Sequence, residues 1–398
     1  MTRHRPFRAA ALIGIVLAVT AVAGCTGSSR SSARSLKSAG PVAVPPLAAG
    51  VAEGGVSWAT VQTGEPGVGG RFWQLLTEDQ ATGKWRLATP PGVADNAGLA
   101  VARAPDGTMT AGFVPGQLLK FSPLATSTDD GAHWAQALLP AGLAPDPDSL
   151  AALPDGRLVA VTTTAVEESA AGAKNWKPLV TLRALAATPY GRSCGLTGLT
   201  GTTAAPDGSV LISGTCRRSG ELGLFGNANG RWQAAGPALS SSSGAGSVTA
   251  TVLGLVSSAA GVSLLIDLET SRGQALIPAW LRAGSRNWSL YRLAGTVAGV
   301  VTSVSGSASG GWVVTLDGRR AVAAETAAAK PGEAEVAPSW PTTFRAPEPD
   351  ATIVPSTSGG FTALVPALSS IAVWQRTGSG WHRTQVISVA SAPAGQSS

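Results

Sequence analysis

The chain has 398 residues, of which 44% are hydrophobic and only 13% are charged, with 50 glycines and 27 prolines. Its formal charge of +6 arises before residue 41, because removing the six basic residues there from the 29 leaves 23 basic against 23 acidic residues. The remainder is neutral, which excludes the usual charge argument for nucleic-acid binding. High apolar content favours a turn-rich β protein over a disordered chain.

The first 40 residues predict an export signal followed by a tether. Three arginines precede an apolar run over residues 9–24, which is short for a membrane span and typical of a signal peptide. The run ends in AVAGC, which resembles a bacterial lipobox, so residues 1–25 are predicted to be a lipoprotein signal peptide ending at Cys25. Residues 26–40 would form a flexible polar tether. We expect a protein held at the extracytoplasmic face of the cell membrane, with the bilayer as its partner through acylated, palmitate-bearing Cys25. The alternative is an ordinary secretory signal with an incidental cysteine.

Two series of motifs repeat along residues 41–398. Glycine turns recur at intervals of 49 to 53 residues, at Gly55, Gly107, Gly156, Gly208, Gly261, Gly311 and Gly360. Turns that lead into tryptophan recur out of phase, at Trp85, Trp134, Trp176, Trp232, Trp288 and Trp381, with Trp340 as a weaker member. Fixed periods of this length are typical of propeller blades or solenoid turns.

The segments between these turns are typical of strands. β-Branched and apolar runs such as GRLVAVTTT, GVSLLIDL and GWVVTL follow the glycine turns. The only helix-like run, at 320–335, stands where a strand is expected. Each unit therefore has four strands. The sequence predicts an all-β fold, a seven-bladed β-propeller of four-stranded antiparallel blades over residues 41–398.

The stretch STDDGAHW has a small hydroxyl, a carboxylate, a glycine and an indole at fixed offsets: Ser127, Asp129, Gly131 and Trp134. Ser and Asp side chains bond back to main-chain groups in tight turns, and Gly tolerates positive φ. The stretch resembles the Asp-box, or BNR repeat, of sialidase-like β-propellers, matched in full in this one repeat. In that family the box lies away from the active site, so the resemblance implies that Asp129 is a turn residue.

Cys194 and Cys216 remain after Cys25, and they flank the turn APDGS. In an oxidising compartment such a pair is most simply a disulfide, which for a loop of about 20 residues contributes roughly 3 kcal/mol. The alternative is two unpaired buried thiols.

The long links between blades are the predicted binding face, because long loops on a rigid scaffold usually carry function. In an up-and-down blade these links share a rim with the second turns, opposite the short glycine and tryptophan turns. The polar candidates on this rim are Asp148, Tyr190, Arg192, Arg217, Glu269, Arg272 and Arg345, with Asp146, Arg218, Glu348 and Asp350 beside them. Several arginines converging on an anion would resemble the sialidase carboxylate clamp. The alternative is that these are solvated loop charges.

Enzymatic residues of the resembled family are largely missing. Sialidases use a tyrosine nucleophile with a glutamate, an acid/base aspartate, three arginines and an Arg-Ile-Pro segment. This chain has only Tyr190 and Tyr291 and lacks Arg-Ile-Pro. A two-carboxylate mechanism would need a pair such as Asp148 with Glu269 or Asp350.

Other chemistries have less support. Beyond the leader, the only histidines are His133 and His382, both in tryptophan turns, which argues against a Ser-His-Asp triad and a His-rich metal site. No glycine-rich phosphate loop opens a helix. No cofactor or metal is expected.

The leading hypothesis is a non-catalytic module that binds a glycan, an envelope polymer or an exported protein, and not nucleic acid. The alternatives are a divergent sialidase-like glycoside hydrolase and an assembly factor for a membrane complex.

Overall fold

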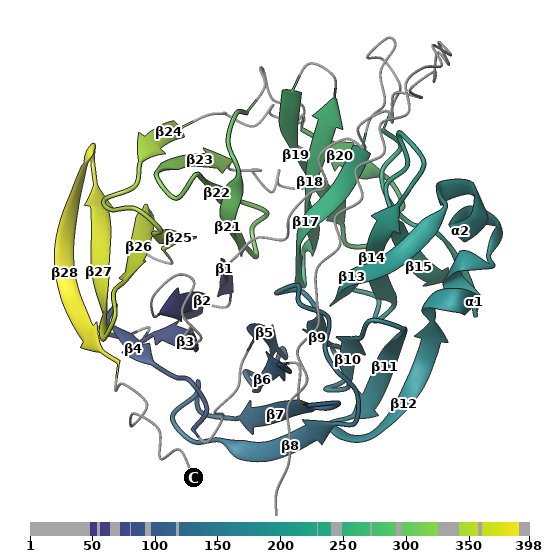
Figure 1. Cartoon of the computed structure of the whole chain (residues 1–398), viewed down its shortest axis with the longest axis horizontal. Coiled ribbons are helices and arrows are strands. Elements are labelled where there is room, and N and C mark those ends of the chain that lie inside the picture. The colour runs from purple at the N-terminus through teal and green to yellow at the C-terminus, as the bar shows by residue number, and fades with distance from the viewer. Residues whose placement is uncertain are drawn as a thin grey trace, which may run out of the picture. The chain divides into compact units, whose positions relative to one another are not determined.

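The computed structural model describes residues 48–389 apart from 54–55, 64–71, 80, 92–96, 117–118, 229, 240–248, 271–272, 292–296, 325–341 and 357–359. These residues form seven blades of four antiparallel strands, which confirms the predicted β-propeller (Figure 1). Cys25, the tether, Gly55, Arg272 and Trp340 lie outside the described residues. No described helix has the length and apolar character needed to cross a membrane.

The first four blades follow one another along the chain. Blade 1 contains β1 (Ala48–Glu53), β2 (Val56–Thr63), β3 (Phe72–Glu78) and β4 (Trp85–Leu87). Blade 2 contains β5 (Gly98–Arg103), β6 (Met109–Val114), β7 (Ser122–Ser127) and β8 (Ala135–Leu139). Blade 3 contains β9 (Leu150–Ala152), β10 (Leu158–Val161), β11 (Ala165–Ala170) and β12 (Lys174–Thr181). Blade 4 contains β13 (Leu196–Ala204), β14 (Val210–Cys216), β15 (Leu224–Ala228) and β16 (Arg231–Ala234).

The last three blades repeat the pattern. Blade 5 contains β17 (Thr249–Ser258), β18 (Gly261–Thr270), β19 (Gly273–Arg282) and β20 (Trp288–Leu290). Blade 6 contains β21 (Val301–Ser307), β22 (Trp312–Leu316), β23 (Arg320–Ala324) and β24 (Thr342–Arg345). Blade 7 contains β25 (Thr352–Pro355), β26 (Phe361–Pro366), β27 (Ser370–Thr377) and β28 (Gly380–Ser388).

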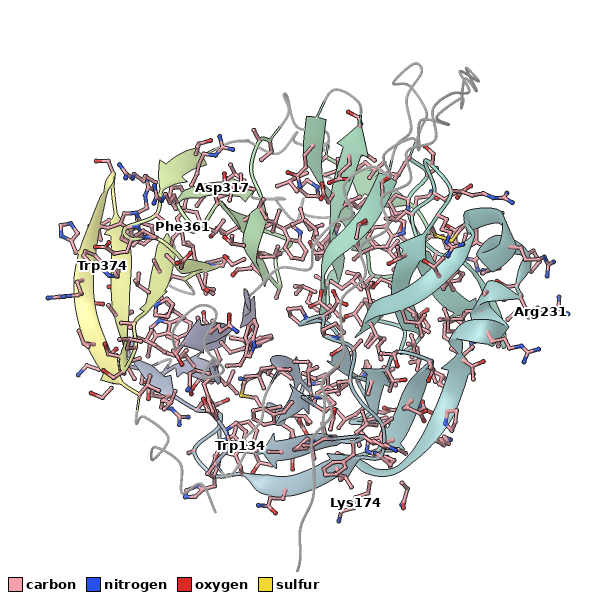
Figure 2. All side chains as sticks on the ribbon, in the orientation of Figure 1. Trp134, Lys174, Arg231, Asp317, Phe361 and Trp374 are labelled. Atoms are coloured by element: carbon pink, nitrogen blue, oxygen red, sulfur yellow. A yellow bond between two sulfur atoms is a disulfide. The ribbon has the colours of Figure 1, made fainter. Side chains whose placement is uncertain are left out.

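The two motif series mark the strand boundaries. The described glycines of the first series lie in the first turn of a blade or at the start of its second strand. The described tryptophans of the second series lie within the fourth strand or immediately before it. Second strands such as β10 and β22 are buried at every position. Each blade packs between two neighbours, so both faces of such a strand are covered, and side chains fill the space between blades (Figure 2).

The inner strand β1 joins blades 1 and 6 along the inner side of blade 7. It pairs with β2 in antiparallel fashion and with β21 of blade 6 in parallel, from Ala48↔Ser303 to Ala52↔Ser307. Gly50 allows a close approach, because a Cβ there would lie 2.9 Å from Val354 and 3.0 Å from the Ser305 hydroxyl. β1 therefore lies against the inner strands of blades 6 and 7 (Figure 1).

The ring closes by packing blade 7 against blade 1, and each of these blades takes all four strands from one end of the chain (Figure 1). One buried apolar cluster contains residues of both blades, including Leu76, Trp85 and Ile371. The Gln385 side chain accepts the Trp85 N–H at 3.1 Å and donates to the Trp85 carbonyl at 2.6 Å. Closure thus depends on packing and side-chain hydrogen bonds between two separate sheets.

The link between blades 3 and 4 contains two short helices where the sequence suggested a loop. They are α1 (Leu182–Ala186) and α2 (Pro189–Cys194), and they lie at the outside of the ring (Figure 1). Thr181 caps α1 and Thr188 caps α2, each accepting a main-chain N–H of its helix. Gly195 ends α2 with a φ of 67°.

Candidate functional site

A cavity of about 660 Å³ lies among the inner strands β5, β9, β13 and β17 and the first turns of their blades. We call it the central cavity. Its walls are mostly small residues, and its larger or polar lining residues include Trp58, Arg103, Asp148, Thr202, Thr203 and Ser257. Its volume lies within the range of about 300–1,000 Å³ that is usual for small-molecule sites.

Three similar turns surround one end of the central cavity, and Pro105, Pro154 and Pro206 of these turns line it. In each turn the next residue, an aspartate, accepts the main-chain N–H two residues further on, at 2.9 to 3.1 Å. Hydrogen bonds from Thr108 hold the pKa of the first of these carboxyls, Asp106, below its usual value. These carboxylates stabilise the turns.

The cavity therefore lies toward the rim of the first turns. The sequence predicts a binding face on the opposite rim, because the links there are longer. Short turns line a cavity here because the inner strands that they follow converge on the centre of the ring.

Asp148 lines the cavity from the link just before β9 and connects three blades. Its carbonyl accepts the Thr202 N–H of β13 at 2.8 Å. Its Oδ2 accepts the Leu255 N–H of β17 at 2.9 Å. The side chain is half-buried, and Oδ1 has no hydrogen-bond partner among the described residues. The carboxyl is therefore fixed in position with one oxygen still available.

Burial raises the pKa of Asp148 to about 7, against the opposing effect of the Leu255 N–H. The neighbouring carboxyl of Asp146 adds to this rise. Burial also raises the pKa of Asp146 to about 7. Near neutral pH each carboxyl is thus divided between its protonated and ionised forms.

Arg103, at the end of β5, also lines the cavity, with 13% of its side chain exposed. Its guanidinium lies 2.9 Å from Asp130 Oδ1, an ion pair without hydrogen-bond geometry. The Asp130 carbonyl accepts hydrogen bonds from Arg86 at 2.7 Å and Thr77 at 3.3 Å, both in blade 1. The turn that carries Asp130 therefore connects the cavity wall to the neighbouring blade.

That turn is the STDDGAHW stretch, and its side chains bond to its own main chain. The Ser127 hydroxyl donates to Asp129 Oδ1 at 2.8 Å and accepts the Gly131 N–H at 2.8 Å. Asp129 Oδ1 accepts the His133 N–H at 2.8 Å, and its Oδ2 lies 2.6 Å from His133 Nδ1. These bonds, those from His133 foremost, hold the pKa of Asp129 far below its usual value. The Trp134 indole donates to the Gly131 carbonyl at 3.1 Å. Asp129 is therefore a turn residue in this structure.

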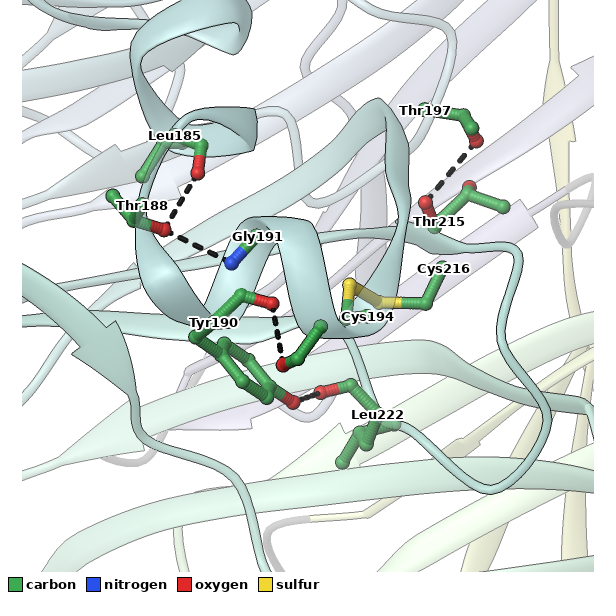
Figure 3. Close-up of a disulfide and its surroundings, with 10 residues drawn as sticks. Leu185, Thr188, Tyr190, Gly191, Cys194, Thr197, Thr215, Cys216 and Leu222 are labelled. Atoms are coloured by element: carbon green, nitrogen blue, oxygen red, sulfur yellow. Dashed lines mark hydrogen bonds between the residues drawn. A yellow bond between two sulfur atoms is a disulfide. The ribbon is translucent and has the colours of Figure 1, made fainter.

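Cys194 and Cys216 form a disulfide that joins the end of α2 to the end of β14 (Figure 3). Next to it, the Tyr190 hydroxyl donates to the Leu222 carbonyl at 2.5 Å, and its ring packs 5.1 Å from that of Phe225. Burial, with a smaller effect of Glu221, raises the pKa of Tyr190 to about 12. This hydroxyl is bonded to the main chain outside the central cavity.

The other predicted face residues do not meet in one place. Arg192 is exposed on α2 and donates to a main-chain carbonyl of its own link. Arg217 is exposed after β14, and Arg345 is exposed at the end of the outer strand β24. Glu269 lies at the second turn of blade 5, with its pKa raised by burial. Of the described candidates, only Asp148 lines the central cavity.

Two cavity residues, Arg103 and Trp58, are not among the residues predicted from the sequence. Arg103 stands directly before the turn APDGT, and Trp58 lies in the strand β2. The sequence signal for Arg103 is its position as a charged residue at the end of an inner strand. Within the described part of the chain, no group of three or more His, Cys, Asp or Glu residues is arranged to hold a metal ion.

Comparisons with known proteins show the fold and not a family. The sequence matches no family model and no curated protein. The structure is similar to a GH74 xyloglucanase from Xanthomonas campestris, with a TM-score of 0.52 and 12% identity over 84% of this chain and 52% of that chain. This chain thus spans about half the length of the xyloglucanase. Weaker similarities, at TM-scores of 0.42 and 0.46, are to a mutant of Aleuria aurantia lectin in complex with α-methyl-L-fucoside and to Pyrococcus horikoshii acylaminoacyl peptidase. The lectin is 12% identical over 87% of this chain and 96% of its own chain. The peptidase is 9% identical over 84% of this chain and 51% of its own chain. The likeness to the xyloglucanase agrees with the β-propeller fold and shows nothing beyond it.

Proposed function

We propose that this protein is an extracytoplasmic binding module that holds its ligand in the central cavity without chemical turnover. One observation carries the proposal, a cavity of about 660 Å³ whose described lining contains a single carboxyl group, Asp148. A cavity of this volume, lined by the first turns, suits the end of a glycan or envelope polymer, or a segment of an exported protein.

Two features favour binding over glycoside hydrolysis. A two-carboxylate mechanism needs a second acid facing the first across the scissile bond, and the described lining supplies none. The hydroxyl of Tyr190, one of the two tyrosines of the chain, donates a hydrogen bond to a main-chain carbonyl away from the cavity. In this proposal, the stretch from Ser127 to Trp134 that resembles an Asp-box has a structural role in the scaffold.

The test is a glycan-array and envelope-polymer screen of the full-length protein, repeated with Ser257→Trp. Ser257 is half-buried and lines the cavity, so an indole there should obstruct it and abolish binding. Ala260→Trp is the matched control, because Ala260 is exposed in the same blade and does not line the cavity. Equal binding by both variants would disprove a cavity site. Turnover of a fluorogenic sialoside or aryl glycoside, lost in Asp148→Asn, would establish the hydrolase instead.

We also propose that Cys25 is acylated and anchors the protein to the membrane. The AVAGC sequence and the polar segment after it support this anchor. Metabolic labelling with an alkyne fatty acid should label the wild type and not Cys25→Ser. The variant should leave the membrane fraction. Unchanged labelling of Cys25→Ser would disprove the anchor and leave the binding proposal intact.

A further inference from the structure

The central cavity has an unbalanced charge. Asp148 Oδ1 has no described hydrogen-bond partner, while Oδ2 is occupied by the Leu255 N–H. Arg103 is the one cationic side chain in the described lining, and it is paired with Asp130. A carboxylate that is partly withdrawn from water is stabilised when a cation or several donors accompany it. The cavity therefore lacks a counter-ion for its own carboxyl.

We propose that the central cavity binds a ligand through a protonated primary amine, with Asp148 as the counter-ion. This inference rests on the proposed function and names the chemistry that the site selects. An ammonium group is a compact charge with three donors, and one free oxygen suffices to pair with it. A guanidinium pairs best with both carboxylate oxygens, and here Leu255 already occupies one of them.

The position of Asp148 suits this task because the surrounding blades fix it. Its carbonyl is bound by β13 and its Oδ2 by β17. Gly201 packs closely on it, since a Cβ at that position would lie 3.0 Å from Asp148 Cβ. A carboxyl held in this way does not need to be ordered when the amine arrives, which lowers the entropic cost of binding.

The same carboxyl gives binding a pH dependence. Among the described residues, Asp146 in the same link is the charged group that acts on Asp148, and Arg103 from β5 is the other charged residue of the cavity wall. The cavity residues of β13 and β17, such as Thr202, Thr203 and Ser257, do not titrate in this range. With its pKa raised to about 7, Asp148 gains a proton as the pH falls, and the attraction for an amine weakens.

The experiment is calorimetric titration of the full-length protein with two amines and their blocked forms. The probes are glucosamine against N-acetylglucosamine, and trialanine against N-acetyl-trialanine. We expect the free amine of at least one pair to bind at least tenfold more tightly at pH 7.5, where the Asp148 carboxyl is mostly ionised and more than half of an α-amino group is still protonated. The preference should fall at pH 5.5. The pair that shows the preference identifies an amino sugar or a peptide amino terminus as the source of the amine.

Variants separate this inference from the proposed function. Asp148→Asn keeps an oxygen for the Leu255 N–H and should abolish the amine preference. Asp106→Asn, a change of the same kind in an exposed first turn, should retain it. Equal affinity for free and blocked forms, no binding by either amine, or a preference that survives in Asp148→Asn would each overturn the inference. Binding of blocked forms that Ser257→Trp abolishes would preserve the proposed function alone.

Discussion

At the scale of single residues, two glycines with similar positive φ angles have different surroundings. Gly131 has a φ of 86°, and a Cβ there would lie 2.8 Å from Ala88 Cβ of blade 1. Gly208 has a φ of 79° and no atom within 4 Å of such a Cβ. The first glycine therefore serves both the turn and the contact between blades 1 and 2, whereas the second serves only its turn.

We expect Gly131→Ala to destabilise the protein more than Gly208→Ala. Both substitutions place an L residue in the left-handed region, at a cost of about 1–2 kcal/mol. Gly131→Ala adds overpacking against Ala88, which costs about 1–3 kcal/mol more. Urea unfolding followed by tryptophan fluorescence measures both. Equal losses of stability would mean that blades 1 and 2 accommodate the added methyl group without a cost in free energy.

Asp146 provides a residue-scale test of electrostatics. Burial raises its pKa from 3.8 to about 7, so between these values the native state holds more protons than the unfolded state. This carboxyl therefore makes the protein less stable as the pH rises through that window. Asp146→Asn has no such group. The free energy of unfolding of Asp146→Asn minus that of the wild type should therefore rise from pH 4.5 to pH 7.5.

The control for this prediction is Asp207→Asn. Hydrogen bonds from Ser209 lower the pKa of Asp207, so its contribution to stability is lost only as the pH falls through that lowered pKa. Relative to wild type, the control should therefore show a constant difference between pH 4.5 and pH 7.5. A constant difference for Asp146→Asn as well would show that its carboxyl ionises as it does in the unfolded chain.

At the scale of elements, the strands were predictable and the helices were not. Glycine turns and tryptophan turns recur with the period of a blade, so they locate strands in blades whose sequences otherwise differ. α1 and α2 contain five and six residues, too few for an amphipathic period to appear. Their signals were the caps Thr181 and Thr188 and the proline that opens α2, which are also typical of a loop.

The disulfide is the covalent link between these helices and blade 4. Cys194 and Cys216 are separated by 22 residues, so the bond restricts a long loop of the unfolded chain. We expect the double variant Cys194→Ser/Cys216→Ser to lose about 3 kcal/mol of stability in urea unfolding. Reductant should lower the stability of the wild type by a similar amount and leave the double variant unchanged. Wild-type stability that does not respond to complete reduction would contradict this expectation.

At the scale of the whole molecule, the repeat predicted the blade count but not what lies at the centre. The cavity residues Trp58, Arg103 and Asp148 belong to three blades and are far apart in sequence. The parallel pairing of β1 with β21 has no local signal either, since each strand also has an antiparallel neighbour within its own blade. Sequence periodicity reports what each blade shares, whereas the site depends on where the blades differ.

Ring closure is the remaining property of the whole molecule. Blades 7 and 1 come from opposite ends of the chain and belong to separate sheets, and the Gln385 side chain bonds β28 to β4 at this junction. Gln385→Ala leaves the Trp85 N–H and carbonyl without these partners in a partly buried setting, which costs about 1–3 kcal/mol. Gln233→Ala, on the exposed face of the outer strand β16, should change stability by less than about 0.5 kcal/mol. Urea unfolding measures both changes in stability. Relative to wild type, hydrogen exchange in Gln385→Ala should accelerate more in β4 and β28 than in β16. Equal stability of the two variants would mean that the apolar cluster between the blades holds the ring closed without this side chain.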